Sequence, residues 1–340
     1  MILNNSNKNN FWNNHTLNDF QHITTLKNIN SIGINSICFL IDGRLALSFV
    51  NNIFIYNKNT FQIEIKIKEK QVIYYMNINK EGILITCLNQ IYINLYKIKG
   101  KKYQIIQTLK ALNNIFKSGH SLYIQKFIEL NNGDLAILAY GLGIFFYKKN
   151  KTYSYLERYY EKKNEHITDI CELDNKQFII SLRGKNMIQF LDMNSKKKII
   201  KSLEPFLFLD SKNELILMNK KDLLILEKNN ISIIDIQKKV KIKNIKLDIV
   251  GSVNCIYKLS DNSLLINYWH NYIEQLKYDE IKKEIKLISK IGNSNYDNKN
   301  IYKIPSISIF NNNNNNLIVF PCNDRLGDTS LNIYKLILKK

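Results

Sequence analysis

Residues 34–67 read INSICFLIDGRLALSFVNNIFIYNKNTFQIEIKI, and this stretch contains four short apolar runs separated by polar turns. Each run has about five to seven residues and alternates at period two, as β-strands do. The Asp42-Gly43 pair between the first two runs is typical of a tight hairpin turn, because glycine tolerates positive φ. The stretch therefore predicts one four-stranded antiparallel sheet.

The same order of runs and turns recurs along most of the chain. Further copies start at Ile73, Ile124, Ile167, Glu214, Val253 and near Pro305. The period is about 40–50 residues, which is typical of β-propeller blades. No segment shows sustained helical periodicity. We therefore expect an all-β protein, a seven-bladed β-propeller with four-stranded antiparallel blades.

The two ends of the chain complement each other in this scheme. The last copy has three strand-like runs, and residues 21–26 (QHITTL) form another run ahead of the first copy. Pairing of the two would complete the last blade and close the ring, which hides an exposed sheet edge. A single propeller domain is then expected over residues 20–340, with residues 1–19 as a flexible, Asn-rich tail. The Asn311–Asn316 run is expected to be an expanded, exposed turn.

Composition favours an intracellular protein, cytoplasmic or nuclear. The N-terminus has no apolar core segment of the kind that signal peptides carry, and no apolar stretch reaches the ~18 residues of a membrane span. The cysteines have no C-x-x-C spacing and lie in or beside apolar runs, so they predict free thiols in a reducing compartment rather than disulfides or a zinc site. They are Cys38, Cys87, Cys171, Cys255 and Cys322.

The formal net charge of +20 has two readings. A basic surface can bind nucleic acid, whereas an AT-rich coding sequence also enriches Lys, Asn and Ile on solvated surfaces without a function. Nearly all the basic residues are lysines, and arginine is the residue preferred for phosphate and base contacts. Lysine-rich segments at 97–102, 194–201 and 237–246 occupy matching positions between third and fourth strands.

The units resemble degenerate WD40 repeats. Gly119-His120, followed by an apolar strand and Asn132-Gly133, is similar to the GH…DG stretch of that family. The family's Trp-Asp position reads Tyr56-Asn57, Leu191-Asp192 and Ile234-Asp235 here. The resemblance implies a propeller used for protein interaction. No unit carries both signature pairs, so the family's His–Ser/Thr–Asp–Trp network is not expected in full, and the Asp residues are expected to bind turn amides.

No catalytic pattern is present. The sequence contains no G-x-S-x-G, P-loop or Rossmann glycine motif, and its histidines have no metal-ligand spacing. The arginine cluster and Asp-box turns of sialidase propellers and the Gly-Gly pairs of kelch blades are also missing. We therefore expect no enzyme activity, no cofactor and no metal.

Turns between second and third strands are the expected partner-binding surface. They carry aromatic and basic residues, which are enriched at interface hot spots. The candidates are Tyr140, Arg183, Lys185, Lys228, Tyr268, Trp269, His270 and Arg325. The segment from Tyr268 to Tyr272 is the densest, although Trp269 could instead pack into a neighbouring blade.

Three functions follow from these features. The first is a non-catalytic protein-interaction scaffold of the WD40-like propeller type. The alternative is a basic propeller associated with RNA or a ribonucleoprotein through its lysine-rich loops. A propeller hydrolase is the third, because convergent site geometry can be invisible in a sequence.

Overall fold

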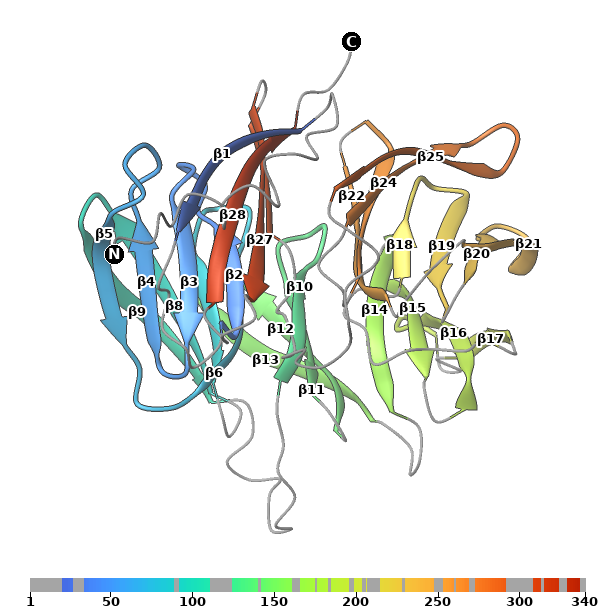
Figure 1. Ribbon diagram of the computed structural model, residues 1–340. Coiled ribbons are helices and arrows are strands. Elements are labelled where there is room, and N and C mark those ends of the chain that lie inside the picture. Colours follow the sequence, from blue (N-terminus) through green and yellow to red (C-terminus); the bar gives the residue numbers. More distant parts are fainter. Residues whose placement is uncertain are drawn as a thin grey trace. The chain divides into compact units, whose positions relative to one another are not determined.

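A computed structural model describes most of the repeated region (Figure 1). The described residues are 20–26, 34–88, 92–110, 124–139, 142–160, 166–174, 176–182, 185–195, 199–203, 206, 215–227, 230–247, 253–259, 261–268, 273–291, 308–312, 315–323 and 329–336. Their regular elements are β-strands. No helix in this part of the chain is long and apolar enough to cross a membrane. The chain divides into two compact units, residues 32–247 and residues 1–31 with 248–340.

The unit of residues 32–247 contains five four-stranded antiparallel sheets, each with its strands in chain order. The first two are β2 (Ser36–Phe39), β3 (Leu45–Phe49), β4 (Asn52–Tyr56) and β5 (Ile63–Lys68), then β6 (Ile73–Ile78), β7 (Leu84–Leu88), β8 (Tyr92–Lys99) and β9 (Lys102–Lys110). The next two are β10 (Ile124–Glu129), β11 (Leu135–Ala139), β12 (Gly143–Lys149) and β13 (Tyr153–Tyr160), then β14 (Ile167–Asp174), β15 (Gln177–Leu182), β16 (Met187–Asp192) and β17 (Ile199–Leu203). The fifth is β18 (Leu215–Leu217), β19 (Asp222–Leu226), β20 (Asn230–Asp235) and β21 (Val240–Lys246).

The other unit contains two four-stranded sheets. One is β22 (Val253–Lys258), β23 (Ser263–Tyr268), β24 (Ile273–Asp279) and β25 (Glu284–Ile291). The second has the order β1 (Phe20–Leu26), β28 (Thr329–Leu336), β27 (Asn315–Asn323) and β26 (Ser308–Asn312). β1 pairs antiparallel with β28, from Phe20 opposite Leu336 to Leu26 opposite Leu331. This pairing confirms that the N-terminal strand completes the last repeat.

The asparagine run differs from its prediction as an expanded turn. Asn311 pairs with Asn316 and Asn312 with Asn315, so four of the six asparagines extend the β26–β27 ladder. Only residues 313–314 connect the strands, and they lie outside the described residues. The backbone of asparagine can donate and accept ladder bonds like that of any non-proline residue, so the hairpin continues through the run.

The predicted turn chemistry is confirmed between first and second strands. Gly43 and Gly133 both have a φ of 86°, and the amide of each donates to the carbonyl three residues before it, at 2.9 Å. An Asp or Asn side chain closes the same turn: Asp42 Oδ1 accepts from the Arg44 amide, and Asn132 Oδ1 from the Asp134 amide. A side chain that bonds its own turn and a residue that tolerates positive φ together fix this hairpin.

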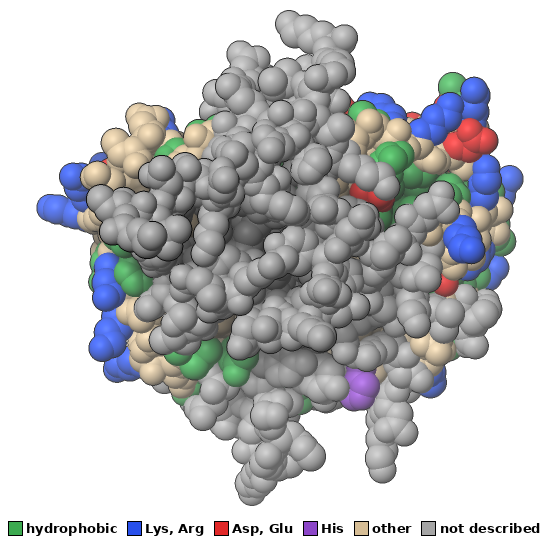
Figure 2. Space-filling view, viewed as in Figure 1, with side chains coloured by type: hydrophobic (Ala, Val, Ile, Leu, Met, Phe, Trp, Pro, Cys, Tyr) green, Lys and Arg blue, Asp and Glu red, His purple; other side chains and the backbone are tan. Residues whose placement is uncertain are grey.

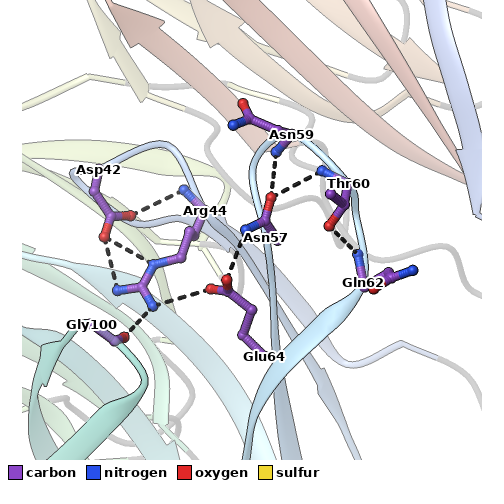
Figure 3. A network of polar contacts seen from close by, with 8 residues as sticks. All are labelled: Asp42, Arg44, Asn57, Asn59, Thr60, Gln62, Glu64 and Gly100. Carbon is purple, nitrogen blue, oxygen red and sulfur yellow. Dashed lines mark hydrogen bonds and ion pairs between the residues drawn. The ribbon is translucent and has the colours of Figure 1, made fainter.

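The residues at the Trp-Asp position bind turn amides, as expected. Asp192 Oδ1 accepts from the Asn194 amide at 2.9 Å, and Asp235 Oδ1 from the Lys238 amide at 2.8 Å. Asn57 Oδ1 accepts from the amides of residues 59 and 60, as Figure 3 shows. Asp279, the last residue of β24, binds the amides of residues 281 and 282 in the same way and is a fourth copy that the sequence pattern did not reveal. These side chains hold the hairpin between the third and fourth strands.

Apolar cores join consecutive sheets in the unit of residues 32–247. Each core takes side chains from two neighbouring sheets, for example Ile53 and Ile67 from the first with Ile73 and Leu84 from the second. Second strands have both faces covered, and β3, β7, β11 and β19 are buried at every residue. Fourth strands are more exposed, and only β5 retains a partly alternating pattern. The predicted period-two alternation is therefore absent from second strands such as β3, which are buried throughout, and from the fourth strands β17 and β21, which are mostly exposed.

Polar groups connect the same sheets. Glu69, between β5 and β6, reaches into the second sheet and accepts from Thr86 Oγ1, Asn94 Nδ2 and Tyr96 Oη at 2.5–3.1 Å. Burial raises the pKa of Tyr96, so its hydroxyl stays a donor. Arg44 spans the same two sheets by pairing with Asp42 and donating to the Gly100 carbonyl (Figure 3). The buried Glu69 carboxylate and Arg44 guanidinium therefore have polar partners, as a low-dielectric interior requires.

Removing the Glu69 carboxylate should destabilise the fold. Glu69→Ala leaves three buried donors without their acceptor, so we expect the free energy of unfolding to fall by about 2–4 kcal/mol. Glu69→Gln keeps one acceptor oxygen and should lose less. Urea denaturation measures both, with the exposed Lys68→Ala as a control expected within about 0.5 kcal/mol of the parent chain. Equal stability of Glu69→Ala and the parent would contradict the network.

The described thiols should resist alkylation in the folded state. Cys38 and Cys87 are buried and Cys171 is half-buried, and burial raises the pKa of Cys38 and Cys171 to about 12 and that of Cys87 further. Since the thiolate is the reactive form, iodoacetamide at about pH 8 should leave all three unmodified. Peptide mapping by mass spectrometry should find them labelled only after unfolding in urea. Labelling of the folded chain at the unfolded rate would show this burial to be wrong.

Candidate functional site

The predicted partner-binding residues fall unevenly on the structure. Lys185 is exposed, between β15 and β16. Tyr140, Arg183, Lys228, Trp269, His270 and Arg325 lie outside the described residues. Their place in the chain, between a second and a third strand, agrees with the strand bounds.

Tyr268 is a correction to that set. It is the last residue of β23, its side chain is fully buried, and its hydroxyl donates to Glu274 Oε2 at 2.6 Å. The strand runs one residue further than the sequence pattern indicates, and the phenol points into the core with its polar end satisfied. Tyr268 therefore packs the sheet and is not part of an exposed turn surface.

A groove lies where the β10–β13 sheet meets the β14–β17 sheet. It has a volume of about 280 Å³, and its floor consists of buried apolar side chains. These are Leu130, Phe146, Phe178 and Met193. The rings of Phe146 and Phe178 face each other from the two sheets, 5.2 Å apart between centroids. Leu156 of β13 also lines the groove and is 41% exposed.

The rim of the groove is polar and comes from three chain segments. The β10–β11 turn supplies Asn131 and Asn132, the β14–β15 turn supplies Lys176, and the residue Asn194 follows β16. All four are exposed. Because an apolar floor beneath a few polar groups is the usual composition of a recognition pocket, this groove is the candidate functional site.

A carboxylate fixes the two sheets on either side of the groove. Glu172 Oε2 of β14 accepts from the Asn131 amide in the turn of the preceding sheet, at 2.7 Å. The same device occurs one sheet earlier, where Glu129 Oε2 accepts from the Lys80 amide at 2.5 Å. Burial raises the pKa of Glu172. The Glu172 carboxyl group thus links the two sheets at the groove.

The charged residues of the groove are mostly acidic. Asp134, Glu157 and Glu172 line it, against Lys176 as the one basic lining residue among those described. The whole chain has the opposite balance, with 49 basic and 29 acidic residues. A locally negative groove in a strongly basic chain favours a ligand with positive charge.

Buried carboxylates elsewhere in the described residues serve the fold. Asp169, for example, pairs with Lys126 Nζ at 2.6 Å and accepts from the Leu215 amide at 3.0 Å, so it joins three sheets. Each buried carboxylate accepts hydrogen bonds from neighbouring groups; they are Glu69, Asp134, Asp169, Asp222, Glu227 and Glu274. Within the ranges described above, no group of three or more His, Cys, Asp or Glu side chains could hold a metal ion.

Comparison with known proteins supports the fold. No family model and no curated protein matches this chain. Among solved structures, the chain is similar to a chain in the crystal structure of the mitotic checkpoint complex and to Chaetomium thermophilum Raptor. The first has a TM-score of 0.69 at 9% identity and covers 95% of this chain and 94% of that chain. The second has a TM-score of 0.72 at 11% identity and covers 95% of this chain and 29% of that chain.

Enzymes also occur among the similar structures. Virginiamycin B lyase from Staphylococcus aureus has a TM-score of 0.65 at 14% identity and covers 94% of this chain and 99% of that chain. Identities this low carry the fold and leave function to the site.

The environment of Glu172 should appear in the pH dependence of stability. The pKa of Glu172 is raised above the ordinary 4.5. Its contribution to the free energy of unfolding is therefore full at low pH and is lost as the pH rises through the pKa of the folded state. Glu172→Gln does not titrate and keeps an acceptor for the Asn131 amide. We expect the urea midpoint of this variant, relative to the parent chain, to rise between about pH 4 and pH 7. A difference that stays constant over that range would mean that burial does not raise this pKa.

Proposed function

We propose that this chain is a non-catalytic protein-interaction scaffold, built as a seven-bladed propeller of the WD40 type and closed by β1. The pairing of β1 with β28 and the one-sheet-per-repeat architecture support this arrangement. The likeness to a chain of the mitotic checkpoint complex supports the scaffold function.

The observation that carries the proposal is that buried carboxylates bind groups of the fold itself. Those in the described residues accept hydrogen bonds within the fold, as Glu69 and Asp169 do when they connect sheets. Groups committed in this way stabilise the framework, and surface turns and grooves are then the parts that meet other molecules. Rigid scaffolds that display variable loops are well suited to recognition.

The turns between second and third strands remain our proposed partner surface. Tyr268 is removed from the set, whereas Trp269 and Arg183 keep their place as its principal residues. Truncation of tryptophan and arginine is the change that most often weakens an interface.

Affinity capture tests this function. The full chain should capture protein partners from a lysate of its own cells, and the double variant Trp269→Ala/Arg183→Ala should lose them. The control is Lys58→Ala/Ile281→Ala, which alters exposed residues in turns between third and fourth strands. Loss in the control as well, or capture unchanged in the double variant, would place the contact elsewhere.

A nuclease arm distinguishes the RNA alternative. Figure 2 shows coloured Lys and Arg side chains in separate groups along the margins of this view. Capture that survives nuclease supports direct protein contact. Capture that disappears with nuclease, and that weakens steeply with salt, would replace the scaffold proposal with the RNA-associated one.

A further inference from the structure

The groove between the β10–β13 and β14–β17 sheets has the size of a side-chain anchor. Its volume of about 280 Å³ is at the lower limit of the ~300–1,000 Å³ of small-molecule pockets. The floor is apolar, with the rings of Phe146 and Phe178 in contact at an interplanar angle of 45° across the junction of the sheets. Such a space suits one large apolar side chain of a peptide better than a cofactor.

The charged residues around this floor determine which residues are favoured on either side of the apolar residue in such a peptide. Glu157 of β13 and Glu172 of β14 line the groove from its two sheets and are half-buried, while Lys176 of the β14–β15 turn is exposed to solvent. Three of the four charged residues that line the groove are acidic, and the partly buried carboxylates are screened less than the exposed Lys176. Positive side chains on either side of the apolar anchor would complement these carboxylates.

We propose that this groove binds a linear peptide segment of a protein partner, in which a large apolar side chain is flanked by Lys or Arg. The inference rests on the scaffold function and adds a second contact surface to it. An acidic or phosphorylated segment is the opposite chemistry, because Glu157 and Glu172 would repel it.

The neighbouring sheet provides matched controls. Leu156 lies one residue before Glu157, which pairs with Phe146 of β12; Ile106 lies one residue before Gln107, which pairs with Leu95 of β8. Their exposures are nearly equal, 41% and 40%. Glu129 matches Glu172 in accepting a turn amide from the preceding sheet.

A ten-residue synthetic peptide library, immobilised and probed with the full chain, tests the proposal. We expect enrichment of peptides with Phe, Leu or Trp between Lys or Arg. Fluorescence anisotropy with an enriched peptide should then show binding weakened about fivefold or more by Leu156→Ala and also weakened by Glu172→Gln. The controls Ile106→Ala and Glu129→Gln should bind like the parent chain.

Three outcomes would overturn the inference: no enriched peptides, enrichment of acidic ones, or equal weakening by the control variants. Circular dichroism and urea midpoints of each variant show whether weaker binding comes from loss of folding. Competition with unlabelled peptide tests, on the parent chain without any substitution, whether binding is specific. If the library fails while lysate partners are still captured through Trp269 and Arg183, the groove proposal fails alone. If both fail, the scaffold function fails with it.

Discussion

The described structure depends on one constraint: the second strand of each sheet must be buried on both faces. A four-stranded sheet with an apolar face on each side cannot be stable alone, and within residues 32–247 each sheet is covered by its neighbours through shared cores. Second strands such as LALSF of β3 and LAILA of β11 are consequently apolar along their length. Buried polar side chains on these strands have partners; the Ser48 Oγ, for example, donates to the Ser36 carbonyl.

The same constraint explains where the polar groups between sheets lie. Glu69, Asp169 and Glu172 each leave their own strand or loop to bind a donor of an adjacent sheet. A hydrogen bond between layers fixes their relative position more narrowly than apolar contact does, because it is directional. The groove results from this arrangement. Glu172 links the two sheets at the turn, and the described side chains do not fill the space between this link and the apolar floor.

Local sequence was sufficient for the parts of the fold that local chemistry determines. Turns with Gly43 or Gly133, the amide-binding Asp192 and Asp235, and the strand at Phe20–Leu26 all follow from a few adjacent residues. The groove could not be found in this way, because Leu130 and Phe178 belong to different repeats and meet only when the sheets pack. One signal was available: Glu129-Leu130 and Glu172-Leu173 occupy the same place in successive repeats. Tyr268 was misplaced because the end of a strand is set by pairing with its neighbour.

The pairing of β1 with β28 also bears on how the chain reaches its folded state. Phe20 finds its partner Leu336 only after the chain has been made up to residue 336. At a synthesis rate of ~10 residues per second, the first strand waits about half a minute on the ribosome with its ladder bonds unmade. The sheets of residues 32–247 use partners close in sequence and can form during that interval. An unpaired strand edge is a template for aggregation, so the interval before β28 emerges is when this protein most needs a chaperone.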